Sequence, residues 1–114
     1  MAEQDWLIPL SAFRAGVEAA ADRAFVGLRR GTMRALLYAP RGPDTQSPHR
    51  QDELYIVQAG AAVFRKAGET RNIGPGDVIF VEAGAEHRFE EFSDDFAVYA
   101  VFWGPVGGEE PRQA

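Results

Sequence analysis

The chain has 114 residues, of which 46% are hydrophobic and 25% charged, a length and balance that predict one globular domain. A net charge of −5 argues against a generic nucleic-acid-binding protein, which needs a basic surface to neutralise phosphates. The absence of cysteine excludes disulfides and thiol nucleophiles. No apolar run approaches the roughly 20 residues of a membrane helix, and the first residues lack the features of a signal peptide. We therefore expect a cytoplasmic protein that binds neither nucleic acid nor membrane.

Residues 1–24 differ from the rest of the chain and predict a short helical arm. Ser11 can cap a helix that begins at Ala12, because its hydroxyl can accept a free backbone N–H. Apolar side chains then recur at helical spacing, namely Phe13, Val17, Ala20, Ala21 and Ala24. This stripe is rich in alanine and contains Gly16, so we expect a marginal helix that packs on the outside of the following domain.

Short apolar segments separated by Gly, Pro and Asp turn residues fill residues 25–104. Six segments are typical of strands, namely Arg34–Ala39, Glu53–Gln58, Ala61–Arg65, Asp77–Val81, Glu86–Phe89 and Phe96–Trp103. Residues 61–73 predict a hairpin. Short strands at this spacing predict an all-β sandwich or small barrel. Residues 105–114, rich in Gly, Pro and Glu, predict a flexible tail.

Several predicted strands are apolar on both faces, whereas a strand with one wet face alternates more cleanly. The residues that we expect to lie on uncovered outer faces are Leu54, Ile56, Ile79 and Val81. The N-terminal arm or a second copy of the chain must cover these faces. Because two-fold dimers are the commonest symmetric assemblies, we expect a homodimer.

The chain has two histidines, His49 and His87, each at the edge of a predicted strand. His49 lies four residues before Glu53, so both side chains can point to the same face of an extended segment. Two neutral imidazoles and one carboxylate can hold a divalent cation and leave open positions for water or a substrate. The alternative is that the histidines are polar residues at a barrel mouth, bonded to Glu53 without any metal.

The spacing around these residues resembles the two sequence motifs of the cupin family. The matching residues are His49, Glu53 and Gly60 in the first motif and Gly76, Gly84 and His87 in the second. The second motif departs from the family at Glu82, where a proline is usual, and at Glu91, where an asparagine is frequent. Both motifs occur in order around the predicted hairpin. The resemblance implies a single-domain cupin, with an all-β double-stranded β-helix, or jelly-roll barrel, over residues 25–104 behind the arm of residues 1–24.

The resemblance also implies a divalent metal ion, Fe, Mn, Ni or Zn, held by His49, Glu53 and His87. Ser47 stands where the first motif usually has a further histidine, so three of the four usual ligands remain. Ser47 could instead bond a metal-bound water, and Gln46 could supply an amide oxygen if it faces inward. Tyr55 follows Glu53 on the same face of the strand, where it fits the barrel core or the wall of a pocket.

Two kinds of function are compatible with such a site. The family implies a metal-dependent enzyme, of dioxygenase, isomerase or lyase type, that acts on a small organic molecule. The other possibility is a non-catalytic domain that binds or senses a small molecule or a metal. The resemblance does not choose between them, because function depends on the site and not on the fold. Tyr38 and Tyr99 could each place a hydroxyl group in the pocket or pack in the core.

Overall fold

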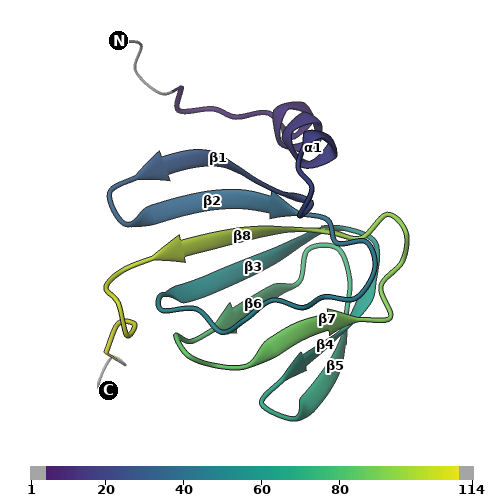
Figure 1. The fold of residues 1–114 in the computed structure, drawn as a ribbon, viewed down its shortest axis with the longest axis vertical. Coiled ribbons are helices and arrows are strands. Elements are labelled where there is room, and N and C mark those ends of the chain that lie inside the picture. The colour runs from purple at the N-terminus through teal and green to yellow at the C-terminus, as the bar shows by residue number, and fades with distance from the viewer. Residues whose placement is uncertain (1–4, 111–114) are drawn as a thin grey trace.

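The computed structural model describes residues 5–110 and shows two antiparallel sheets facing each other, with one helix outside (Figure 1). The larger sheet has the strand order β1-β2-β8-β3-β6, and the smaller sheet has the order β5-β4-β7. The elements are α1 (Leu10–Ala19), β1 (Ala24–Arg30), β2 (Met33–Tyr38), β3 (Asp52–Ala59), β4 (Ala62–Lys66), β5 (Glu69–Ile73), β6 (Val78–Val81), β7 (His87–Glu90) and β8 (Ala97–Trp103). Because neighbouring strands come from distant parts of the chain, the fold is a jelly-roll barrel, which confirms the predicted all-β class.

All six predicted strands are present, and no strand end moves by more than one residue. The predicted hairpin is the β4–β5 pair, in which Ala62 lies opposite Ile73. Strand β1 was not predicted, because Gly27 and the terminal arginines interrupt its apolar alternation. A Cβ atom on Gly27 would lie 2.6 Å from the ring of Phe13. The glycine that interrupts the strand pattern in the sequence therefore makes room for the helix in the fold.

Helix α1 begins at Leu10, and the predicted cap at Ser11 is wrong. Pro9 occupies the N-cap position without a side-chain hydrogen bond, and its carbonyl accepts the N–H of Ala12 at 3.0 Å. Proline suits this place because its fixed φ, here −69°, already matches the helix entrance. The helix ends at Ala19, so the predicted apolar stripe stops before Ala20.

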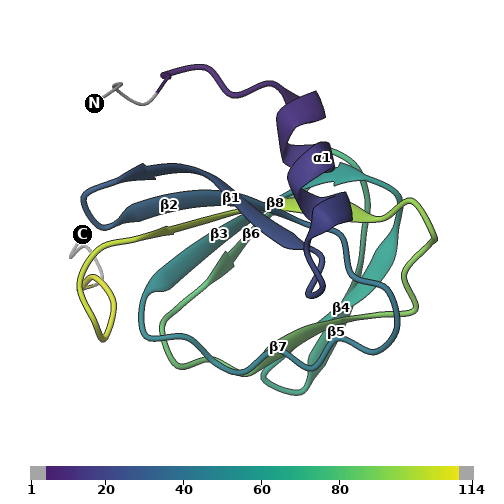
Figure 2. The same ribbon diagram turned by 45° about the horizontal axis from the view of Figure 1, so that its top comes forward.

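The helix covers the β1–β2 end of the larger sheet (Figure 2). Phe13 and Val17 are buried against Leu37 and other residues of the sheet's outer face. A Cβ atom on Gly16 would lie 2.1 Å from Cγ of Phe25. Gly16 therefore weakens the isolated helix but allows it to lie close to β1. No helix in residues 5–110 is long and apolar enough to cross a membrane.

The core lies between the two sheets and corrects one prediction about strand faces. Tyr55 pairs with Ile79, and Leu54 pairs with Phe80. Because opposite residues of an antiparallel pair point to the same face, Ile79 points inward with Tyr55, and so does Val81, which is fully buried. The expectation that Ile79 and Val81 lie on an outer face is wrong. The exposed residues of β6 are instead Val78 and Phe80, at 62% and 49% exposure.

The chain after β8 folds back onto the start of β3. The N–H of Glu109 donates to Oδ2 of Asp52 at 2.8 Å, and the N–H of Ala83 donates to its Oδ1 at 3.0 Å. The N–H of Gly107 donates to the carbonyl of Arg50. Asp52 thus joins three segments that are distant in sequence. Residues 111–114 of the expected tail, like residues 1–4 of the expected arm, lie outside the described residues.

Candidate metal centre

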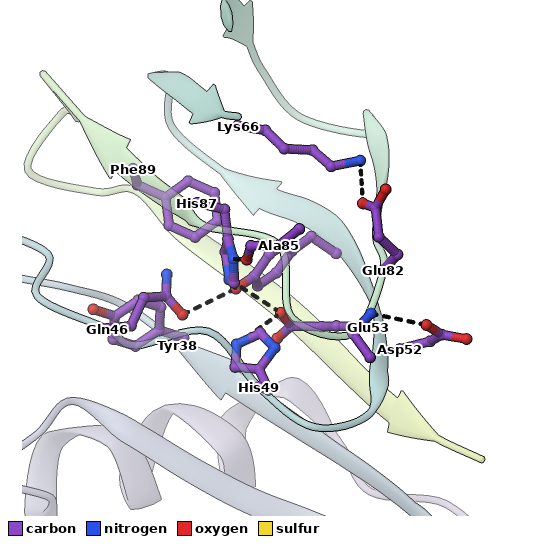
Figure 3. A network of polar contacts seen from close by, with 12 residues as sticks. Tyr38, Gln46, His49, Asp52, Glu53, Lys66, Glu82, Ala85, His87 and Phe89 are labelled. Carbon is purple, nitrogen blue, oxygen red and sulfur yellow. Dashed lines mark hydrogen bonds and ion pairs between the residues drawn. The ribbon is translucent and has the colours of Figure 1, made fainter. Parts of the chain in front are cut away.

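The structure brings His49, Glu53 and His87 together inside the barrel (Figure 3). His49 lies in the loop between β2 and β3, Glu53 near the start of β3, and His87 at the start of β7. Nε2 of His49 lies 3.3 Å from Oε1 of Glu53, and Nε2 of His87 lies 3.5 Å from the same oxygen. One donor atom from each residue falls within a cluster 4.8 Å across.

Strand alternation and a loop-to-loop hydrogen bond produce this convergence. β3 lies between β8 and β6 in the larger sheet, and its inward positions are Glu53, Tyr55 and Val57, all buried. Glu53 is therefore fixed by pairing on both sides of its strand. The N–H of Gly84 donates to the carbonyl of His49 at 2.8 Å, which ties the His49 loop to the turn that precedes His87.

Two of the three residues, His49 and Glu53, have candidate ligand atoms without hydrogen-bond partners within the described residues. Both ring nitrogens of His49 and Oε1 of Glu53 are shielded from solvent and make no hydrogen bond there. Glu53 is 2% exposed, and a buried carboxylate oxygen without a partner is costly. The two separations from Glu53 are shorter than twice a metal–ligand bond of about 2.0–2.2 Å, and all three donor atoms lie within 4.8 Å of one another, a spacing at which a group of this kind could hold an ion. The site therefore fits a divalent cation.

The environment sets the protonation of the two rings. Nδ1–H of His87 donates to the carbonyl of Ala85 at 2.9 Å, which leaves the Nε2 lone pair facing Glu53. Burial lowers the pKa of His49. The carboxylate of Glu53 opposes this effect, but the positive charges of His87 and Arg34 lower the pKa further. Burial alone would also lower the pKa of His87, but the nearby carboxylate of Glu53 and the carbonyl of Ala85 favour the protonated ring and raise the pKa. His49 is thus held in the neutral form that a metal requires.

A chain of polar groups runs from the cluster into the loop before His49. The hydroxyl oxygen of Tyr55 lies 3.1 Å from both Nε2 of His87 and Oε1 of Gln46. Nε2 of Gln46 donates to Asp44 at 2.8 Å, which turns the amide oxygen of Gln46 toward Tyr55. Burial, reinforced by the charge of Glu53, raises the pKa of Tyr55 far above its usual range. Tyr55 is therefore a neutral phenol with one proton for two acceptors.

Asp44 organises this chain and was not singled out from the sequence. Its buried carboxylate accepts hydrogen bonds from the hydroxyl of Tyr38 at 2.9 Å, the amide of Gln46 at 2.8 Å and the N–H of Phe89 at 2.8 Å. An aspartate after a proline- and glycine-rich turn looks like any exposed loop acid in sequence. The feature that distinguishes it, burial against β7, depends on the fold.

A cavity of about 430 Å³ opens above the cluster. Its apolar wall includes Leu36, Ala100 and Phe102, and its polar wall includes His49, Glu53, Gln46, Tyr55, Tyr38, Arg23 and Arg41. Of the predicted accessory residues, Gln46 and Tyr55 line the cavity, whereas Ser47 is exposed and is not part of its wall. Tyr99 packs edge-on against Phe13, beneath the helix and away from the cluster.

Comparison with known proteins agrees with this architecture. The cupin domain family matches residues 36–103. The protein SCO3923 of Streptomyces coelicolor is 40% identical over 90 residues, which span 76% of this chain and 86% of that protein.

Two solved structures share the fold. The first is a cupin 2 conserved barrel domain protein from Salinispora arenicola, which has a TM-score of 0.61 and 25% identity and aligns over 72% of this chain and 75% of that chain. The second is the DMSP lyase DddQ from Ruegeria pomeroyi, which has a TM-score of 0.60 and 26% identity, with 71% of this chain but 46% of that chain covered. By its sequence match and its barrel, this chain belongs to the cupin family.

Proposed function

We propose that this cupin binds one divalent metal ion through His49, Glu53 and His87 and uses it as an enzyme acting on a small organic molecule. The observation that carries the proposal is the set of buried donor atoms, without partners among the described residues, that borders a 430 Å³ cavity. Dioxygenase, isomerase and lyase reactions all suit such a centre. The similarity to a DMSP lyase favours the lyase type.

The bound ion would polarise a substrate oxygen as a Lewis acid. His49 and His87 would supply neutral nitrogen donors, and Glu53 would supply the one anionic donor. Tyr55 would hold a proton at its hydroxyl oxygen, 3.1 Å from Nε2 of His87. Gln46 would keep that hydroxyl in place. Since the pKa of Tyr55 is raised, this group would keep its proton and act as a hydrogen-bond donor to the substrate or to a neighbouring side chain.

A non-catalytic binding or sensing role is the second candidate. If His49, Glu53 and His87 serve as ligands, the remaining carboxylate on the cavity wall belongs to Asp22. That carboxylate is exposed and accepts the N–H of Ala24 at 3.3 Å. Among the described residues that line the cavity, no buried carboxylate then remains to act as a general base beside the ion, which favours binding over turnover.

Metal uptake tests the proposal directly. Metal-free protein is titrated with Fe²⁺ under anaerobic conditions, Mn²⁺, Ni²⁺ and Zn²⁺, and bound metal is measured by calorimetry and elemental analysis. We expect one equivalent per chain and at least a tenfold loss of affinity in His49→Ala and in His87→Ala. Glu82→Gln is the matched control for Glu53→Gln, because Glu82 is an exposed acid.

Two outcomes would contradict the proposal. Stoichiometric uptake that survives both histidine substitutions would place the metal elsewhere. No uptake of any of the four metals by the unmodified protein would leave the histidines as polar residues of the barrel. Turnover and binding are then separated by incubating loaded protein with a pool of small organic acids and following both their masses and their chromatographic retention. A dioxygenase or lyase changes the mass, an isomerase changes the retention alone, and a binding domain changes neither.

We also propose that the protein forms a homodimer. The outer face of β3 and β6 exposes Val78 and Phe80 beside half-buried Leu54 and Ile56. Helix α1 packs on β1 and β2 instead of this face. A second copy of the same face would remove these side chains from water.

A further inference from the structure

We propose that the cavity above the metal centre selects small organic carboxylates, which Arg23 and Arg41 bind at its mouth. This inference rests on the proposed metal function and names the substrate class of that site. Buried Glu53 marks the cavity floor, and exposed Asp22 and Arg41 mark its mouth. The inference follows from how the two arginines are held and from the charge of the cavity.

Arg23 is fixed in place by backbone and side chain together. It has φ of 60°, a left-handed conformation that is costly for residues other than glycine and is concentrated at functional sites. Its Nε–H donates to the carbonyl of Ala39 at 3.0 Å, and its NH1 group lies 3.2 Å from Glu18. The side chain is 17% exposed, and its guanidinium has five N–H groups, so three remain available on a residue that lines the cavity.

Arg41 is presented by a stiff turn. It lies between Pro40, which is buried, and Gly42, whose φ of 75° allows the chain to reverse. Pro43 and the buried Asp44 then fix the end of this turn. Arg41 makes no hydrogen bond or ion pair with the residues that the structure describes, although Asp94 borders a neighbouring hollow together with it. Its planar group is therefore free to bind a carboxylate through two N–H groups.

The charges on the wall favour an anion. Asp22 and Glu53 balance Arg23 and Arg41 among the lining residues, and Glu18, outside the wall, pairs with Arg23. A divalent cation beside Glu53 would therefore leave at least one positive charge in excess around the cavity. A ligand with negative groups offsets that excess.

The apolar wall narrows the choice of anion. Leu36, Ala100 and Phe102 line the same cavity as the two arginines and Glu53. Hydrocarbon is the chemistry that suits this wall. The ligand class is therefore a short carbon chain with an oxygen group for the metal at one end and a carboxylate for the arginines at the other. An inorganic phosphate would neutralise the excess positive charge but would make no apolar contact with this wall.

The test measures how much a second carboxylate on the ligand increases its affinity for the protein. Protein loaded with Mn²⁺ is titrated calorimetrically with glutarate and adipate and with pentanoate and hexanoate, which have the same chain lengths but one carboxylate. We expect the dicarboxylates to bind about tenfold more tightly, as a charge-assisted pair of hydrogen bonds provides. Arg41→Gln and Arg23→Gln should each reduce this ratio to about two or less while the metal stoichiometry stays at one.

Two controls separate recognition from folding. Arg88→Gln removes an exposed arginine outside the cavity wall and should leave the ratio unchanged. Urea denaturation of Arg23→Gln and Arg41→Gln then shows whether a lost ratio comes with a lost fold, and a ratio lost only in variants that are unfolded at the assay temperature would contradict the inference. If Arg23→Gln does not fold, Arg41→Gln decides the question, because Arg41 has no partner to lose within the described residues.

Three outcomes would overturn the inference. They are equal affinities for the mono- and dicarboxylates, an unchanged ratio in Arg41→Gln, and tighter binding of inorganic phosphate than of either dicarboxylate. Each of these can occur with full metal uptake, and the proposed metal function then stands. Failure of metal uptake would instead overturn both proposals.

Discussion

Asp44 illustrates how much one buried carboxylate can organise. It accepts hydrogen bonds from Tyr38, Gln46 and Phe89, so one side chain connects the β2–β3 loop with β7. An amide in its place would set an N–H group against donors that now face an oxygen. We expect Asp44→Asn to lower the free energy of unfolding by about 2–3 kcal/mol, measured by urea denaturation of the metal-free protein.

The control for this prediction is Asp94→Asn, since Asp94 is an exposed acid and its substitution should change the free energy of unfolding by less than about 0.5 kcal/mol. Equal effects of the two substitutions would mean that the Asp44 network contributes little to stability.

Tyr55 offers a second test at the same scale. Its one proton cannot serve His87 and Gln46 at once, and a metal on Nε2 of His87 would leave the proton to Gln46. We expect Tyr55→Phe to lower the stability of the metal-free protein by about 1 kcal/mol and to change metal affinity by less than threefold, measured by calorimetry. Tyr99→Phe is the matched control. A loss of affinity as large as that of His87→Ala would show instead that the phenol oxygen is itself a ligand.

The sequence predicted candidate ligands through the spacing of His49, Glu53 and His87, because strand alternation places Glu53 on a defined face and the motifs place the histidines at strand edges. It did not predict the polar chain behind them. The orientation of Gln46 depends on Asp44, and Asp44 is buried only because a loop crosses β7. Loop paths of this kind are set by tertiary contacts and leave no periodic signal.

At the scale of elements, the close contact between α1 and β1 makes Gly16 stabilising, although glycine within a helix usually destabilises it. Replacing Gly16 by alanine raises the intrinsic helix propensity by about 1 kcal/mol, but the new Cβ would lie 2.1 Å from Cγ of Phe25. We expect Gly16→Ala to lower the free energy of unfolding by about 1–2 kcal/mol, measured by thermal and urea unfolding.

A double-mutant cycle isolates the cause of this loss. With the ring removed in Phe25→Ala, the same Gly16→Ala substitution should become neutral or stabilising. Destabilisation of equal size in both backgrounds would mean that the clash with Phe25 is not responsible.

The six strands predicted from the sequence lie within one residue of their observed bounds because turn residues mark their ends, whereas β1 was missed and the inward face of β6 was not predictable. Val78, Ile79, Phe80 and Val81 are all apolar, so alternation within β6 does not say which pair is inside. The register with β3 decides it by placing Phe80 opposite Leu54. Register is a property of two strands, and a single strand's sequence does not contain it.

At the scale of the whole molecule, the exposed face of β6 predicts the assembly. We expect a dimer in light scattering at micromolar concentration, and a monomer for Phe80→Glu, because a charge at the centre of an apolar contact must be desolvated. Val106→Glu is the matched control, since Val106 is also an exposed apolar residue, at 75%. A monomeric unmodified protein, or a Phe80→Glu dimer, would contradict the proposed interface.

The segment from Pro40 to His49 has a consequence for how such a barrel can diversify. It carries Arg41, Asp44, Gln46 and His49 in ten consecutive residues and runs between β2 and β3 without a regular element of its own. The proposed anion-binding arginine, the residues that orient Tyr55 and one proposed metal ligand thus lie in a single irregular stretch that connects two strands of the larger sheet. Exchanging this stretch between related barrels would therefore transfer the choice of ligand in one step, while Glu53, His87 and the two sheets stay unchanged.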